Sequence, residues 1–244
     1  MASLPDPREQ LAVALDLPDG RAALKLVNRL GDACLWLKVG MELYYAAGNA
    51  LVAELRNRGY KIFLDLKLHD IPNTVAGGVR SASHAGAQLL TVHAGGGGRM
   101  LEAAANAAGP PGAPRLLAVT VLTSMDAREL EAVGVFDPPA EQVLRLARLA
   151  FSSGIRGMVC SAEEVNVLRK ELGPEAFLVV PGIRPAGTTA GDQRRIATPY
   201  DAISAGASML VVGRPITMAA DPAAATREIL AEIAHAGAVL VDRA

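Results

Sequence analysis

The sequence has little cysteine and almost no net charge. Its two cysteines, Cys34 and Cys160, each lie in an apolar segment, which predicts small buried residues and not a disulfide or a metal site. This usage fits a reducing cytoplasm. A net charge of −1, with basic and acidic residues interspersed, lacks the electrostatic footprint of a protein that binds nucleic acid or an anionic membrane. An anionic ligand would therefore have to be bound by a local group of residues.

The sequence also lacks a long apolar run and a linker. No segment approaches the roughly 18 consecutive apolar residues of a membrane span. Residues 1–10 contain prolines and charges where a signal peptide would have an apolar core, so we expect a soluble, untargeted protein. Because no stretch rich in Pro, Gly or Ser divides the 244 residues, and 51% of them are hydrophobic, we expect a single domain over residues 1–244.

Strand-length apolar runs alternate with segments of helical spacing along the whole chain. Most runs are continuously apolar, as is typical of parallel strands covered on both faces. The expected strands are 11–17, 34–40, 61–68, 88–94, 115–124, 157–162, 176–183 and 209–214. The expected helices are 21–30, 42–58, 74–84, 99–107, 140–151, 163–172, 199–205 and 221–234, and residues 126–139 receive no assignment. This alternation predicts a (β/α)₈ barrel, with a doubly wound open sheet as the alternative.

The positions of the polar residues favour the barrel. In a (β/α)₈ barrel the active site lies at the carboxyl ends of the strands. Polar side chains fall at or just beyond the ends of the expected strands, at Asp16, Lys38, Asp65, Lys67, His93, Thr123, Arg184 and Arg214.

The third expected strand carries charges that an apolar strand has no structural need for. Side chains alternate along a strand, so Asp65 and Lys67 point the same way, and Asp70 follows where the strand should end. Burying such charges costs several kcal/mol per ion unless they compensate one another, which favours a functional cluster. The structural alternative is an Asp–Lys ion pair with Asp70 as a helix cap before Pro72.

Lys38, on the second strand, would join this cluster, although it could also be a strand-end lysine that reaches solvent. Flanking carboxylates keep Lys67 an ammonium ion, and thus a proton donor. A Schiff-base lysine must lose its proton, so this environment argues against one.

The ends of the last two strands carry glycine and arginine together. Barrels commonly bind phosphate in the loops after these strands, where glycine permits close backbone approach and arginine forms bidentate bonds. The segments 181–184 and 212–215 thus predict a phosphate site that includes Arg184, Gly213 and Arg214, with Gln193 as a further amide donor.

The glycine run 95–98 has neither the Lys-Ser/Thr ending of a P-loop nor the spacing of a dinucleotide fingerprint, so we interpret it as a tight strand-to-helix turn. His93 has no His or Cys partner at ligand spacing, which favours a structural histidine over a metal ligand. Asp16 and Thr123 are single polar groups that could orient hydroxyls and base edges, or cap a helix.

These motifs together resemble one known family. The string 65–74, Asp-Leu-Lys-Leu-His-Asp-Ile-Pro-Asn-Thr, is similar to the signature of the orotidine 5′-phosphate decarboxylases. The resemblance extends over nearly the whole chain, through segments 14–16, 37–40, 91–94, 122–124, 181–184, 191–194 and 212–214.

The resemblance implies a cofactor-free, metal-free homodimer that decarboxylates orotidine 5′-monophosphate to uridine 5′-monophosphate in de novo pyrimidine synthesis. It makes Lys67 the proton donor to C6, with Asp65 and Lys38 completing the charged network, and it places Lys38 and Asp16 at the ribose hydroxyls. It directs Asp70, Ile71 and Thr74 into the neighbouring subunit's site. Thr123 would lie beside the pyrimidine, and Gln193, Gly213, Arg214 and Arg184 would hold the phosphate.

Two other functions remain as alternatives. A metal-dependent sugar-phosphate decarboxylase or aldolase of the same barrel group would carry an acidic metal ligand on the second strand, where this sequence has Lys38, a cation that opposes Mg²⁺ binding. A catalytically silent phosphate-binding protein would need the charge cluster to be purely structural.

Overall fold

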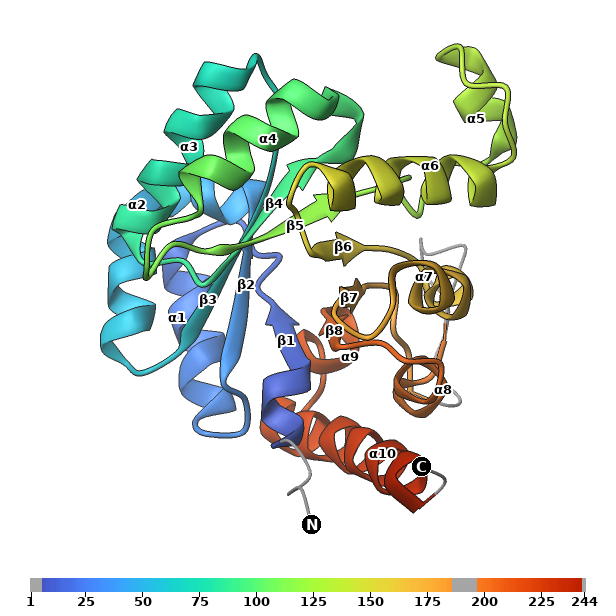
Figure 1. The fold of residues 1–244 in the computed structure, drawn as a ribbon. Helices are drawn as coiled ribbons and strands as arrows, with labels where there is room; N and C mark the ends of the chain where they lie inside the picture. The colour runs from blue at the N-terminus through green and yellow to red at the C-terminus, as the bar shows by residue number, and fades with distance from the viewer. Residues whose placement is uncertain (1–5, 186–196, 243–244) are drawn as a thin grey trace.

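In the computed structural model, which describes residues 6–185 and 197–242, parallel strands close into a barrel in the order β1 to β8 (Figure 1). Strand β1 pairs with β8 through Leu11–Leu210, Ala12–Val211 and Val13–Val212, which confirms the barrel and excludes the open sheet. The strands are β1 Leu11–Ala14, β2 Trp36–Gly40, β3 Lys61–Leu68, β4 Leu89–His93, β5 Arg115–Val119, β6 Gly157–Val159, β7 Phe177–Val180 and β8 Met209–Val212.

Helices cover the outside of the barrel (Figure 1). The α-helices are α1 Gly20–Leu30, α2 Met41–Asn57, α3 Pro72–Ala85, α4 Gly98–Ala107, α5 Ala127–Ala132, α6 Pro139–Ser152, α7 Val165–Leu172, α8 Pro199–Ser204, α9 Arg214–Thr217 and α10 Pro222–Asp242. Short 3₁₀ turns lie at η1 Pro7–Gln10, η2 Ala94–Gly96 and η3 Ala162–Glu164. Among the residues that the structure describes, no helix is long and apolar enough to cross a membrane.

The structure differs from the predicted elements in several places. Helix α10 continues to Asp242 and not only to 234, because Gly237 lies within the helix and does not end it. The predicted helix 42–58 is broken at Gly48, whose φ of 58° and ψ of −156° are accessible only to glycine. Helix α5 forms within 126–139, where a capping box joins Asp126 and Glu129.

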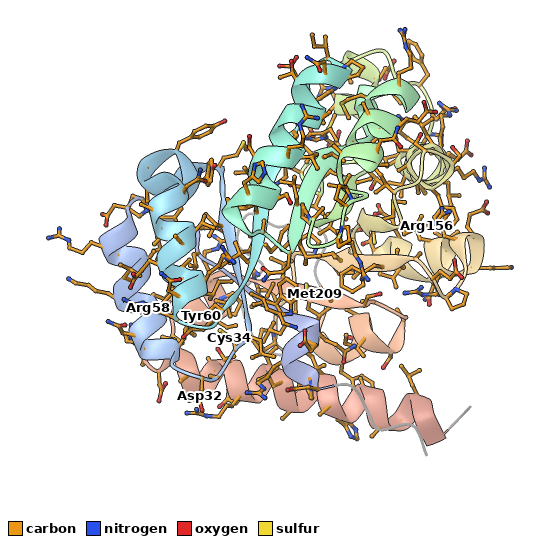
Figure 2. All side chains as sticks on the ribbon, turned by 60° about the vertical axis from the view of Figure 1, so that its left-hand side comes forward. Asp32, Cys34, Arg58, Tyr60, Arg156 and Met209 are labelled. Carbon is orange, nitrogen blue, oxygen red and sulfur yellow. The ribbon has the colours of Figure 1, made fainter. Side chains whose placement is uncertain are left out.

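Two apolar layers explain why the strands are so uniformly hydrophobic. One set of strand side chains fills the barrel interior, and the other packs between the strands and the helices. The interior set consists of Ala12, Ala14, Trp36, Phe63, Leu89, Leu117, Val179, Met209 and Val211. Figure 2 shows Met209 in the middle of the molecule. Because successive strand residues alternate, Lys38, Asp65 and Thr91 continue the inward-facing rows.

Both cysteines are buried, as predicted. Burial raises the pKa of the Cys34 thiol to about 12, and it raises the pKa of the Cys160 thiol as well. Neither thiol is therefore ionised near neutral pH. Figure 2 shows Cys34 beside Tyr60, and Cys34 comes just before the amino end of β2.

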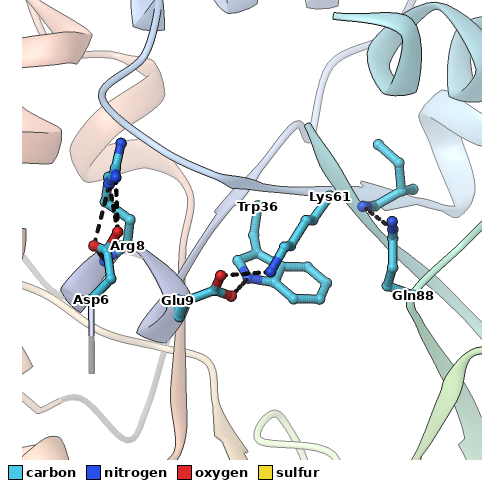
Figure 3. A network of polar contacts seen from close by, with 7 residues as sticks. Asp6, Arg8, Glu9, Trp36, Lys61 and Gln88 are labelled. Atoms are coloured by element: carbon cyan, nitrogen blue, oxygen red, sulfur yellow. Dashed lines mark hydrogen bonds and ion pairs between the residues drawn. The ribbon is translucent and has the colours of Figure 1, made fainter. Parts of the chain in front are cut away.

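Polar contacts connect η1 and the amino ends of the strands (Figure 3). The Glu9 carboxylate accepts hydrogen bonds from the Trp36 indole, at 2.9 Å, and from Lys61, at 2.5 Å. The Gln88 side chain accepts a bond from the backbone N–H of Ile62 at 2.7 Å. These contacts tie η1, β2, β3 and the start of β4 together at this end of the barrel.

Candidate active site

A pocket of about 620 Å³ opens at the carboxyl ends of the strands. Its volume falls in the range of small-molecule sites. Most of the residues that the sequence analysis singled out line it: Asp16, Lys38, Asp65, Lys67, Thr123, Arg184, Gly213 and Arg214.

Charged side chains form one connected row across β1, β2 and β3. The Lys67 ammonium lies 2.8 Å from Oδ1 of Asp65, and the Lys38 ammonium lies 3.5 Å from Oδ2 of the same carboxylate. Lys38 also donates a hydrogen bond of 3.0 Å to Asp16. The predicted network of Lys38, Asp65 and Lys67 is thus present, and Asp16 bonds to a lysine and does not cap a helix.

The four charged side chains of this row differ in how far they are exposed to solvent. The side chains of Lys38 and Asp65 are only 8% and 15% exposed, whereas Lys67 is 28% exposed and Asp16 64%. Burial opposes ionisation of Asp65, but the charges of Lys38 and Lys67 and the bonds from Lys67 and Thr91 outweigh it and hold the pKa of Asp65 below its usual value. The pocket therefore holds a carboxylate between two cations.

Strand β3 is distorted where it carries Lys67. The pairing with β4 shifts register between Leu64 and Leu68, and Lys67 has a φ of 49°, in the left-handed region. Thr91 on β4 accepts a hydrogen bond from the Lys67 backbone N–H at 2.8 Å and donates one to Asp65 Oδ1 at 3.0 Å. Sequence reasoning missed Thr91, although it is the one hydroxyl within the otherwise apolar run 89–92.

Asp70, Ile71 and Thr74 do not line the pocket of their own chain. All three are exposed, and Ile71 is 67% exposed. Asp70 accepts a bond of 2.6 Å from the N–H of the adjacent Ile71, and the N-cap position of α3 is Ile71 itself. Asp70 is therefore neither a helix cap nor, within one chain, part of the charged row.

Two arginines that follow β7 and β8 also line the pocket. Arg184 is buried, 8% exposed, and donates a 2.8 Å bond to the carbonyl of Ile183. Burial, and then the positive charge of Arg214, lower the pKa of Arg184. Two guanidinium groups that repel one another at a pocket wall favour an anion between them. Gln193, predicted to join them, lies outside the described residues.

The predicted turn at the glycine run is present, as η2 followed directly by α4. His93 is half-buried, and its ring lies 5.4 Å from that of His69. Burial, followed by the charges of His69 and Lys67, lowers the pKa of His93. Among the described residues, no group of three or more His, Cys, Asp or Glu side chains could hold a metal ion.

The pocket wall also includes a set of apolar side chains. Among them are Phe63, Val119, Val159, Val179 and Val211. A planar ring could pack on these side chains while an anionic tail reaches the arginines and polar hydroxyls reach Lys38 and Asp16.

The chain is similar in sequence to known proteins. Residues 9–229 match the sequence model of a family described as orotidine 5′-phosphate decarboxylase / HUMPS. The orotidine 5′-phosphate decarboxylase of Halorhodospira halophila is 54% identical over 236 residues, 96% of this chain and all of the relative. That of Anaeromyxobacter sp. (strain K) is 53% identical over 225 residues, 92% of this chain and 98% of the relative.

Solved structures are similar as well. The crystal structure of the orotidine 5′-phosphate decarboxylase from Lactobacillus acidophilus has a TM-score of 0.83 at 44% identity and covers 92% of this chain and 99% of that chain. An uncharacterized conserved protein from Geobacillus kaustophilus has a TM-score of 0.80 at 39% identity, over 91% of this chain and 99% of the other.

Proposed function

Because the chain belongs to the orotidine 5′-phosphate decarboxylase / HUMPS family, we propose a mechanism for its conversion of orotidine 5′-monophosphate to uridine 5′-monophosphate. This reaction is the decarboxylation that completes de novo pyrimidine nucleotide synthesis, and it makes the protein a carboxy-lyase. The observation that carries the mechanism is the 2.8 Å contact between Lys67 and Asp65 at the pocket wall.

The difficulty of the reaction lies at C6 of the pyrimidine. When the bond from C6 to the carboxylate breaks, its electron pair stays on C6, and no adjacent carbonyl can delocalise it. A fixed ammonium at Lys67 stabilises this developing negative charge and then donates a proton, which forms the C6–H bond of the product. Asp65 compensates the positive charge of Lys67 and orients its ammonium, and Lys38 in turn compensates the charge of Asp65.

Asp70 has a different role in this proposal. Supplied by a second subunit, its carboxylate would lie near the departing carboxylate and disfavour the ground state. The exposure of Asp70, together with Ile71 and Thr74, supports a contribution to a neighbouring chain because none of the three lines its own pocket.

The remaining assignments concern the ribose, the pyrimidine and the phosphate of the substrate. Lys38 and Asp16 bind ribose hydroxyls, and Thr123 lies beside the pyrimidine. Arg184, Gly213 and Arg214, together with Gln193, bind the phosphate. Their position at the pocket wall supports this for all but Gln193, which rests on the sequence resemblance. Phosphate contacts far from C6 then supply binding energy that orders the charged row.

A homodimer of this chain, acting in the cytoplasm, fits these features. Apolar side chains are exposed at the start of α2 and just before α3, with Tyr45 at 82%, Ile71 at 67% and Met41 at 45%. Such apolar surface is a common sign of a protein–protein interface.

The competing function within the family group is a metal-dependent sugar-phosphate decarboxylase or aldolase. Lys38 argues against it, because this ammonium lies between Asp16 and Asp65 and occupies the place where a divalent cation would need carboxylates. Loss of activity after dialysis against a chelator, with recovery on adding Mg²⁺, would favour this alternative.

The proposal is tested by following the absorbance of orotidine 5′-monophosphate with purified wild-type protein and Lys67→Ala. The wild type should consume the substrate, and the variant should lose on the order of 10²–10⁴-fold in kcat, as expected when a positioned proton donor is removed. Lys25→Ala, on an exposed face of α1, is the matched control and should retain wild-type turnover. Near-normal turnover of Lys67→Ala would contradict the role given to Lys67. An inert wild type that still binds uridine 5′-monophosphate would point to a silent binding protein.

A further inference from the structure

Strand β4 presents one residue to the distorted part of β3. The pairing Leu64–Leu90 is followed by Leu68–Val92, so residues 65–67 of β3 lie opposite Thr91 alone. Such a bulge interrupts the backbone ladder and leaves N–H and C=O groups of the longer strand without their regular partners.

The Thr91 hydroxyl replaces the missing ladder contact. It accepts the Lys67 backbone N–H at 2.8 Å and donates to Asp65 Oδ1 at 3.0 Å. Thr91 is fully buried, with 0% exposure, so water does not compete for these bonds. The hydroxyl therefore links the backbone of one charged residue to the side chain of the other.

Lys67 needs such a link because its backbone is unusual. It is the only non-glycine residue in the described part of the chain with a positive φ. Residues with a Cβ rarely adopt this conformation unless their surroundings enforce it. Because the strand is bulged here, a change of this φ would redirect the Lys67 side chain and lengthen its 2.8 Å contact with Asp65.

The same hydroxyl also sets the rotation of the Asp65 carboxylate. Oδ1 accepts hydrogen bonds from the Thr91 hydroxyl and the Lys67 ammonium, and Oδ2 faces the Lys38 ammonium at 3.5 Å. One buried group thus orients both members of the central ion pair.

We infer that Thr91 is a positioning residue for the decarboxylation, which holds Lys67 in its left-handed conformation and fixes the carboxylate of Asp65. The inference rests on the function proposed above. It assigns Thr91 no contact with the substrate.

Three substitutions separate the hydroxyl from the rest of the side chain. Thr91→Val keeps the shape and removes the hydroxyl, Thr91→Ser keeps the hydroxyl and removes the methyl group, and Thr91→Ala removes both. The control is Thr226→Val in α10, which is equally buried and loses a bond of 2.7 Å to the carbonyl of Pro222, far from the pocket.

We expect Thr91→Val and Thr91→Ala to lower kcat by about tenfold to a hundredfold, the scale of effect when a reacting group is displaced by about 1 Å. The KM for orotidine 5′-monophosphate should change little, because the phosphate and ribose contacts are untouched. Thr91→Ser should keep a kcat close to that of the wild type. Thr226→Val should lower the melting temperature without changing kcat.

The inference would be overturned if all three variants had the kcat of the wild type. It would also be overturned if Thr91→Ser lost as much kcat as Thr91→Val and Thr91→Ala. If Thr91→Val does not fold, Thr91→Ser and Thr91→Ala are compared instead. A higher kcat for Thr91→Ser supports the inference, and equal kcat values contradict it. A wild type without turnover would instead overturn the proposed function, and with it this inference.

Discussion

Asp65 is the residue on which both lysines of the pocket depend. Its two carboxylate oxygens face different ammonium groups, at 2.8 Å and 3.5 Å, and its side chain is 15% exposed. Removing its charge leaves Lys38 buried, with the largely exposed Asp16 as its one remaining ion-pair partner among the described residues. Loss of one partner of a buried pair is expensive because an uncompensated charge stays behind.

This dependence predicts a pH-dependent stability. The pKa of Asp65 is lower in the folded protein than in the unfolded chain, so its contribution is present above the unfolded value of about 3.9 and disappears as the pH falls through the folded value. Asp65→Asn should therefore lower the free energy of unfolding at pH 7 by on the order of 3 kcal/mol. The deficit should shrink below about pH 4.

Urea unfolding of both proteins from pH 7 to acid, at one protein concentration, measures this difference. Asp32→Asn, an exposed aspartate after α1, should match the wild type throughout. A deficit for Asp65→Asn that stays constant with pH would show that the carboxylate charge is not its source.

Much of the charged row could be predicted from sequence, for a simple reason. Side chains alternate along a strand, which predicted that Asp65 and Lys67 share a face, and charges at the carboxyl ends of parallel strands meet at one rim. The two side chains do meet, although β3 is bulged between Leu64 and Leu68. Thr91 could not be found this way. A threonine within a strand is ordinary, and no local pattern shows that three residues of β3 would face this single position.

At the scale of elements, the long helices were predictable because their apolar spacing is strong and their ends carry signals. The Asp221-Pro222 start of α10 is present, with Asp221 accepting the N–H of Ala224 at 3.0 Å. The break at Gly48 escaped prediction because helical spacing continues on both sides of it. The Asp126–Glu129 capping box was a visible signal for α5, in a segment that received no assignment.

The cap of α10 has a measurable effect on stability. Asp221→Ala removes the acceptor for an N–H of the first turn, and we expect it to lower the free energy of unfolding by about 1 kcal/mol. Thermal and urea unfolding would detect this change, while kcat should not change because α10 does not line the pocket. Glu228→Ala, on an exposed turn of the same helix, should stay within about 0.5 kcal/mol of the wild type. Equal stabilities for the two variants would show that the Asp221 cap does not stabilise this helix.

At the scale of the whole molecule, the proposed dimer makes each site a product of two chains. Lys67 faces the pocket of its own chain, whereas Asp70 is exposed outside it. If Asp70 completes the site of a partner, then variants that each lack one of the two charges should complement one another.

Lys67→Ala and Asp70→Asn should each be nearly inactive alone. Mixed in equal amounts and allowed to exchange subunits, they should regain about a quarter of wild-type activity, because half of the dimers are mixed and each mixed dimer has one intact site. Assays before and after exchange measure the recovery. A mixture of Lys67→Ala with Asp65→Asn is the control and should stay inactive. Lys67 and Asp65 belong to the site of their own chain, so each mixed dimer would have both of its sites disabled. No recovery in the first mixture would refute a shared site.

The pairing of β1 with β8 has a consequence for synthesis on the ribosome. Leu11 is translated 199 residues before its partner Leu210. The first strand must therefore wait, with one edge unsatisfied, until β8 has left the exit tunnel. In this interval the nascent chain presents an edge to which chaperones can bind.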